Sequence, residues 1–157
     1  MLKKIYSDPF EVLYHIYTLC GLKHSEPLME KESAEYSACT FHLDNSIIQF
    51  RIANTTPIKS GQFVTFWKRM GTSSIQPYDF NDPFDFLVIS TRKENQVGQF
   101  IFPKNILAKQ GVLSINGKGG KRAMRVYSEW DTALNHQAHC PSRCVARTID
   151  FTLKNKD

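Results

Sequence analysis

Cationic side chains are the residues of this sequence whose types and spacing point most directly to chemistry. Lys and Arg bind phosphate groups by charge and hydrogen bonding, and glycine-containing loops let the backbone come close to such a ligand. One group of cations surrounds the loop that ends at Gly61, and another follows three closely spaced glycines. The set predicted to bind nucleic acid is Arg51, Lys59, Lys68, Arg69, Lys118, Lys121, Arg122 and Arg125.

The first group lies in residues 51–69, which contain four of these cations and no Asp or Glu. Its centre is Thr55-Thr56-Pro57-Ile58-Lys59-Ser60-Gly61, a loop rich in hydroxyl groups and turn-forming residues. The hydroxyl and N–H groups of such a loop suit phosphate oxygens. An ordinary solvated hairpin loop has the same composition, so both interpretations are open at this point.

The second group is Gly117-Lys118-Gly119-Gly120-Lys121-Arg122-Ala123-Met124-Arg125, with four cations and no acid in nine residues. It is not a nucleotide P-loop, because Arg122 follows Lys121 where that motif needs Ser or Thr. Cations on a loop before a strand suit phosphate contacts that position a nucleic acid without reading its bases. A solvated turn is the alternative.

Trp67 and Trp130 lie beside charged residues and are candidates for base stacking.

A run of carboxylates offers a different chemistry. Asp79, Asp82 and Asp85 recur every three residues before a strand-like stretch. Metal-dependent nucleases hold Mg²⁺ with an Asp at a strand edge and an acid-x-Lys triplet on the next strand, and that triplet is missing here. The rival hypothesis is therefore a nuclease with a degenerate restriction-endonuclease-like site, using Glu35, Asp82 or Asp85 with Lys59. Turn chemistry also explains the Asp run, and a third hypothesis is a sensor of a small anionic ligand.

Zinc-type ligands occur near the end of the chain, at His136, His139, Cys140 and Cys144. Four ligands within nine residues would make a cramped tetrahedron. The four cysteines of the chain show no spacing typical of a disulfide framework, and reduced thiols are the simpler interpretation. We therefore expect neither a metal nor another cofactor.

The net charge of +5 is divided unevenly along the chain. Residues 1–50 carry four Lys/Arg and seven Asp/Glu, a balance of −3, whereas residues 51–157 carry sixteen and eight, a balance of +8. An uneven charge distribution indicates which partners a protein can bind and says little about its fold. It favours a polyanion as the partner of the later residues.

The bulk composition is that of one globular domain. The 157 residues fit a single domain over 1–157, and 41% are hydrophobic, enough for a core. No apolar run approaches the roughly 20 residues of a membrane helix, and the basic first residues precede no apolar stretch typical of a secretory signal. We expect a cytoplasmic protein with no membrane partner.

These candidate sites must be positioned by a few helices and several strands. Asp8, Pro9 and Gly21 have the positions of helix start and stop signals, so the sequence predicts a helix over 9–22. A short helix is predicted over 105–110. Strand-like stretches are 36–43, 47–52, 62–68, 84–90, 99–102 and 123–127, with a turn at Asp44-Asn45-Ser46. The expected fold class is α+β: a curved, mainly antiparallel or mixed sheet of about six strands, with the N-terminal helix packed on it.

Several blocks together carry a family resemblance, in order along the chain. They are Glu35-Tyr36-x-Ala38, Phe50-Arg51-x-Ala53-x-x-Thr56-Pro57-x-Lys59-x-Gly61-Gln62-Phe63-Val64, Trp67-Lys68-Arg69, Asp82-x-x-Asp85, Gly98-Gln99-Phe100-Ile101-Phe102-Pro103-Lys104, and Gly120-Lys121-Arg122-Ala123-x-Arg125-Val126-Tyr127 with Trp130. Over residues 32–138 the sequence resembles the MepB-like family.

The resemblance implies a small, single-domain, bacterial cytoplasmic protein that interacts with nucleic acid. The chain departs from the family pattern in two places. Asn54 stands where a Lys is expected, and residues 139–157 form a divergent tail in place of a Gln/Trp-rich segment.

Overall fold

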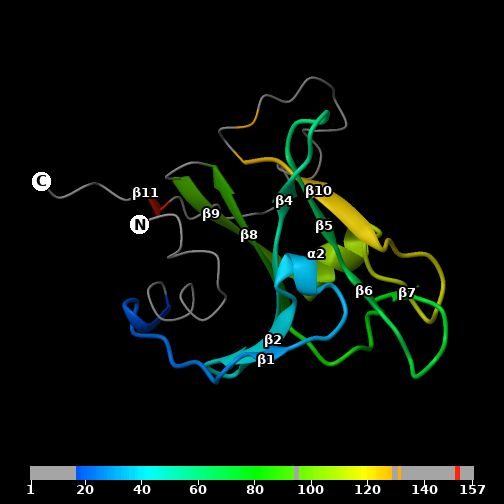
Figure 1. Ribbon diagram of the computed structural model, residues 1–157. Coiled ribbons are helices and arrows are strands. Elements are labelled where there is room, and N and C mark those ends of the chain that lie inside the picture. The colour runs from blue at the N-terminus through cyan, green and yellow to red at the C-terminus, as the bar shows by residue number, and fades with distance from the viewer. Residues whose placement is uncertain (1–16, 94–95, 129–130, 132–150, 153–157) are drawn as a thin grey trace, which may run out of the picture.

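The described part of the chain is built mainly of β-strands (Figure 1). This computed structural model describes residues 17–93, 96–128, 131 and 151–152. Within them, one short α-helix, α2 (Lys104–Lys109), and one 3-10 helix, η3 (Ala34–Tyr36), accompany the strands. No helix in these ranges has both the length and the apolar character that crossing a membrane requires.

Six strands form the larger sheet, in the order β1-β2-β3-β8-β9-β11. Every neighbouring pair is antiparallel except the central one, where β3 runs parallel to β8. The sheet thus consists of two antiparallel halves joined along one parallel seam. The bounds are β1 (Leu28–Met29), β2 (Cys39–Leu43), β3 (Ser46–Ile52), β8 (Phe86–Lys93), β9 (Gln96–Pro103) and β11 (Phe151–Thr152).

A second, three-stranded sheet lies in the order β10-β5-β4, all antiparallel, and a two-stranded ribbon pairs β6 with β7. The chain leaves β3 into β4 and returns from β7 into β8, so the second sheet is inserted between the two central strands of the first. The bounds are β4 (Asn54–Thr55), β5 (Gln62–Thr65), β6 (Trp67–Lys68), β7 (Gln76–Pro77) and β10 (Ala123–Val126).

Two apolar clusters flank the larger sheet because both of its faces are covered. The cluster between the two sheets includes Val64, Phe66, Leu87, Ile89, Phe100 and Val126. The cluster on the opposite face includes Tyr17, Phe41, Ile48, Phe50 and Val88. Side chains of β3 and β8 therefore alternate between two buried environments.

Five of the six strands expected from the sequence are confirmed with shifted ends, whereas the strand expected over 62–68 is split into β5 and β6, which belong to different sheets. Leu43 pairs with Ser46, which makes Asp44-Asn45 the tight turn of the first hairpin, and Asp44 takes the positive φ of 50° that such turns need. The short helix expected near 105–110 is α2.

The expected α+β class, with a helix packed on the sheet, is wrong. The described residues are mainly strand and contain no long helix, and the layer that covers the inner face of the larger sheet is the second sheet. The helix predicted over 9–22 falls largely on residues outside the described part; Tyr17 and Thr18 are helical, a turn ends at Gly21, and the Leu22 N–H donates to the Tyr17 carbonyl. Alternating apolar residues such as Val64 and Phe66 supply the layer that we had assigned to a helix.

Candidate nucleic-acid interface

The outer face of the second sheet presents polar and aromatic side chains together. In the strand register, Phe63 of β5 lies between Arg125 of β10 and Asn54 of β4. These residues are half-buried or exposed, whereas Val64 and Val126 point to the core. Alternation along the strands therefore separates an apolar inner face from an outer face, which η3 partly covers through Tyr36 on Phe63 and Ser33 on Thr65.

Arg125 is held in place on this outer face. Its guanidinium carbon lies 5.7 Å from the centre of the Phe63 ring, and Nη1 donates to the carbonyl oxygen of Ser60 at 3.3 Å. The Tyr36 ring, from η3, meets the Phe63 ring edge-on at 6.2 Å between centroids. A cation stacked on an aromatic face keeps its charge, so the Arg125 guanidinium is held in a defined position.

The glycine-rich loop before β10 is organised by one carboxylate. Asp79 accepts hydrogen bonds from Ser114 Oγ at 2.7 Å, from the Gly117 N–H at 3.0 Å and from the Asn81 N–H at 3.0 Å. These donors lower the pKa of Asp79 to about 2, the Ser114 hydroxyl being the largest cause.

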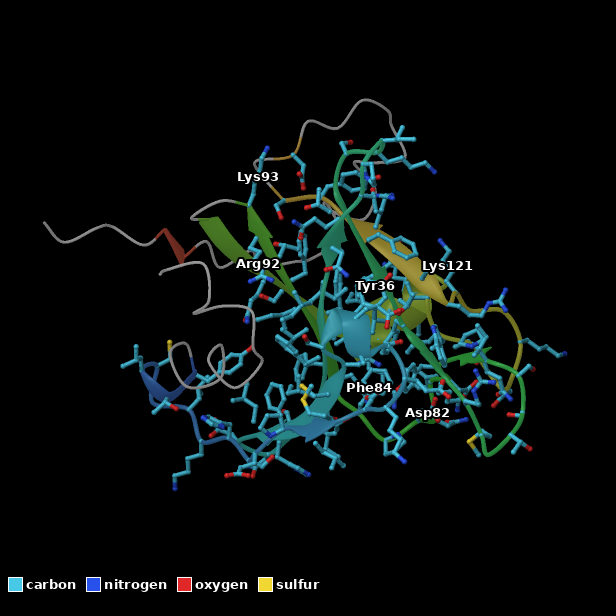
Figure 2. The ribbon with its side chains drawn as sticks, in the orientation of Figure 1. Tyr36, Asp82, Phe84, Arg92, Lys93 and Lys121 are labelled. Carbon is cyan, nitrogen blue, oxygen red and sulfur yellow. The ribbon has the colours of Figure 1, made fainter. Side chains whose placement is uncertain are left out.

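Gly120 fixes the other end of that loop. Its φ is +88°, and an added Cβ would lie 2.5 Å from Pro77 Cβ and 2.8 Å from the Ser114 nitrogen. Both ends of the loop are therefore fixed by contacts with the rest of the protein. The side chains of Lys118, Lys121 and Arg122 on this loop are exposed. Figure 2 shows Lys121 beside the start of β10.

The loop between β4 and β5 is anchored in the same way. Gly61 has a φ of +77°, and an added Cβ would lie 2.7 Å from the Tyr127 ring, so no side chain fits there. Lys59 is exposed in this loop. Asn54, at its start, donates from Nδ2 to the Glu35 carbonyl oxygen at 3.2 Å.

Two of the predicted cations outside the core, Lys68 and Arg69, are neutralised by carboxylates. Lys68 Nζ lies 2.7 Å from Asp82 Oδ1, and Arg69 Nε lies 2.8 Å from Glu32 Oε1. The Arg69 guanidinium also lies 5.7 Å from the centre of the Trp67 ring. Lys68 and Arg69 therefore belong to local ion pairs and contribute less charge to an interface.

Arg51 does not lie on a surface, contrary to the expectation that it is part of an exposed cationic face. Its side chain is 0% exposed between the two sheets, where Nη2 lies 3.1 Å from Glu30 Oε2 and Nη1 donates to the Phe50 carbonyl at 2.8 Å. Its guanidinium carbon lies 5.5 Å from the centre of the Phe66 ring. Arg51 is therefore a buried cation paired with Glu30, and it is not available to a ligand on the surface.

Two cations that sequence reasoning missed lie near the base of the β4–β5 loop. Arg92 and Lys93 end strand β8, and Gln62 Nε2 donates to the Arg92 carbonyl at 2.6 Å (Figure 2). In the sequence, the two adjacent cations Arg92-Lys93 directly after an apolar, strand-like stretch could have indicated this. Among the described residues, no ion pair involves Lys59, Arg92, Lys93, Lys118, Lys121, Arg122 or Arg125.

The carboxylates of the nuclease hypothesis have structural partners instead of one another. Asp82 Oδ2 accepts from the Asp79 N–H, and Asp85 Oδ2 accepts from the Ile47 N–H, both at 2.7 Å. Within the described ranges, no three His, Cys, Asp or Glu side chains are grouped to hold a metal ion. The zinc candidates His136, His139, Cys140 and Cys144, and Trp130, lie outside the described residues.

Comparisons with known proteins agree with the resemblance seen in the sequence. The model of the family described as MepB-like matches residues 30–146, a range that extends past Ala138. A crystal structure of MepB is similar to this chain, with a TM-score of 0.78 and 31% sequence identity, over 91% of this chain and 96% of that one. No curated protein matches the sequence.

Proposed function

The chain belongs to the MepB-like family, and we propose that this member binds nucleic acid through the outer face of its second sheet and the two loops beside it. The observation that carries the proposal is the distribution of charge. Seven cations outside the ion pairs of the described residues lie on β8, β10 and the two loops: Lys59, Arg92, Lys93, Lys118, Lys121, Arg122 and Arg125.

The arrangement suits a long polyanion better than a small anion. The cations come from three separate stretches of chain, and the Arg125 guanidinium among them lies over the Phe63 ring at 5.7 Å. A nucleic acid repeats its phosphates over such a distance and gains affinity from each counterion that it releases. The arrangement supports phosphate contacts that position a strand or duplex, not a base-reading site.

The glycine-rich loop before β10 is already ordered in the free protein. The glycine-rich loop is fixed by Asp79 at one end and by Gly120 at the other, so Lys121 and Arg122 lose little backbone freedom when a phosphate binds. Binding groups that are ordered in advance spend less free energy on ordering at the moment of contact. We place this binding in the cytoplasm, with DNA or RNA as the partner and no membrane.

The test is anisotropy of labelled mixed-sequence oligonucleotides, single-stranded and duplex, between about 50 and 200 mM salt. With roughly five phosphate contacts, we expect a log–log slope of roughly −4 on duplex. Replacing both Lys121 and Arg122 by Ala should weaken binding to every sequence alike and make the slope shallower by roughly two, one for each contact.

The matched control is Lys23→Ala with Lys31→Ala, which removes the same charge from two exposed lysines in the acidic first third of the chain. A slope near zero, or an equal loss in both double variants, would contradict the proposal. Inorganic phosphate that competes at micromolar concentration would instead favour a sensor of small anions. Mg²⁺-dependent cleavage of the same oligonucleotides, lost in Asp85→Asn, would favour the nuclease.

A further inference from the structure

The loop between β4 and β5 carries the most exposed large apolar side chain of the described residues. Ile58 is 95% exposed, and its neighbours Pro57 and Lys59 in the loop are also exposed. Apart from Pro57, its neighbours Thr56, Lys59 and Ser60 are polar, so Ile58 and Pro57 form a small apolar tip and not an extended apolar patch. It contributes no packing to the free protein.

The base of this loop is fixed although its tip is exposed. Gly61 lies directly beneath the Tyr127 ring, and Arg125 Nη1 bonds to the Ser60 carbonyl. Within the loop, Thr56 Oγ1 donates to the Lys59 carbonyl at 3.4 Å. These contacts fix the base of the loop, so Ile58 is presented at a defined place.

One cation lies in the loop next to Ile58, and three more lie near its base. Lys59 follows Ile58 directly, Arg125 is bonded to the base of the loop, and Arg92 and Lys93 lie at the end of β8 to which Gln62 is bonded (Figure 2). An apolar partner surface gains nothing from the cations at Lys59, Arg92, Lys93 and Arg125 near this loop. A stack of base pairs flanked by two phosphate backbones offers both an apolar interior and negative charge on each side.

We propose that the β4–β5 loop inserts Ile58, with Pro57 beside it, between stacked base pairs of duplex DNA from the minor groove. The proposal rests on the function proposed above and names duplex DNA as the substrate of that interface. Apolar residues such as Ile and Pro serve as wedges that partly unstack a base step and kink the duplex. Pyrimidine–purine steps such as TA unstack at the lowest cost, so the wedge favours them while Lys59, Arg92, Lys93 and Arg125 hold the backbone.

The experiment uses the full chain and a duplex with 2-aminopurine beside a central TA step. The probe's fluorescence rises when its stacking is lost. The wild-type protein should raise the fluorescence on binding. Ile58→Ser should abolish that rise and lower affinity for this duplex roughly tenfold. It should leave the salt slope unchanged, because no cation is removed.

The matched control is Leu28→Ser, which removes an apolar side chain that is 74% exposed on β1, at the edge of the other sheet. It should behave as wild type in both fluorescence and affinity. Wild-type binding without a rise, or a rise retained in Ile58→Ser, overturns the wedge and leaves nucleic-acid binding standing. A wild-type protein that binds neither this duplex nor a single strand removes both proposals.

Discussion

Replacing Glu30 by Gln should destabilise the protein strongly although Glu30 lies outside both apolar clusters. Glu30 Oε2 lies 3.1 Å from Arg51 Nη2, and the two side chains are 26% and 0% exposed. Arg51 keeps its charge when its partner is neutralised, because a guanidinium does not lose its proton in proteins. Breaking a buried pair costs about 3–5 kcal/mol. A quarter of Glu30 is open to water, so we expect about 3 kcal/mol, at the low end.

Urea unfolding followed by tryptophan fluorescence measures this loss. With an m value of about 1.5–2 kcal/mol/M, the midpoint should fall by roughly 1.5–2 M. Glu32→Gln is the matched control, since its pair with Arg69 has side chains 44% and 36% exposed and should contribute less than about 1 kcal/mol. Adding Arg51→Met to Glu30→Gln should recover much of the loss, because apolar replacement removes the uncompensated charge. Equal losses in Glu30→Gln and Glu32→Gln would refute the reasoning.

Two further predictions concern the glycine-rich loop. The pKa of Asp79 is lowered from 3.8 to about 2, so its carboxylate stabilises the fold fully above about pH 4, and this contribution disappears as the pH falls through 2. Asp79→Asn should therefore lower the Tm at pH 7 but not at pH 2, and equal differences at both pH values would contradict this. Gly120→Ala should cost about 1–3 kcal/mol more than Gly119→Ala in urea unfolding, because both glycines have positive φ but only Gly120 abuts Pro77 and Ser114. Similar losses would mean that the loop relaxes freely.

The strands could be predicted from the sequence because their signals are local. Alternation in residues 47–52 and the turn at Asp44-Asn45 are decided by neighbours, and the structure places a hairpin there. The identity of the layer that covers the larger sheet could not be predicted from such local signals. Val64 and Val126 look like strand residues in either architecture, and only their pairing in a second sheet shows which face they cover.

Arg51 shows why part of the candidate site was assigned wrongly. In an alternating strand, a cation is normally read as the exposed side, but β3 is covered on both faces, so Gln49 and Arg51 are buried as well. The counterions that neutralise Arg51 and Arg69 are Glu30 and Glu32, from a stretch more than twenty residues earlier in the chain. No local spacing reveals such pairs. The loop cations Lys59, Lys118, Lys121 and Arg122 were placed on the surface correctly because glycine and polar neighbours decide loop exposure.

The parallel seam between β3 and β8 has a consequence for how quickly the chain folds. The hairpins β2–β3 and β8–β9 close over a few residues each and can form early. The seam that joins them pairs Ile48 with Phe86, so the whole segment that carries β4 to β7 must be looped out first. Closing a loop of that length costs entropy before any contact along the seam repays it, and topologies rich in such distant pairings fold slowly. The seam is therefore the step at which we expect the folding rate to be set.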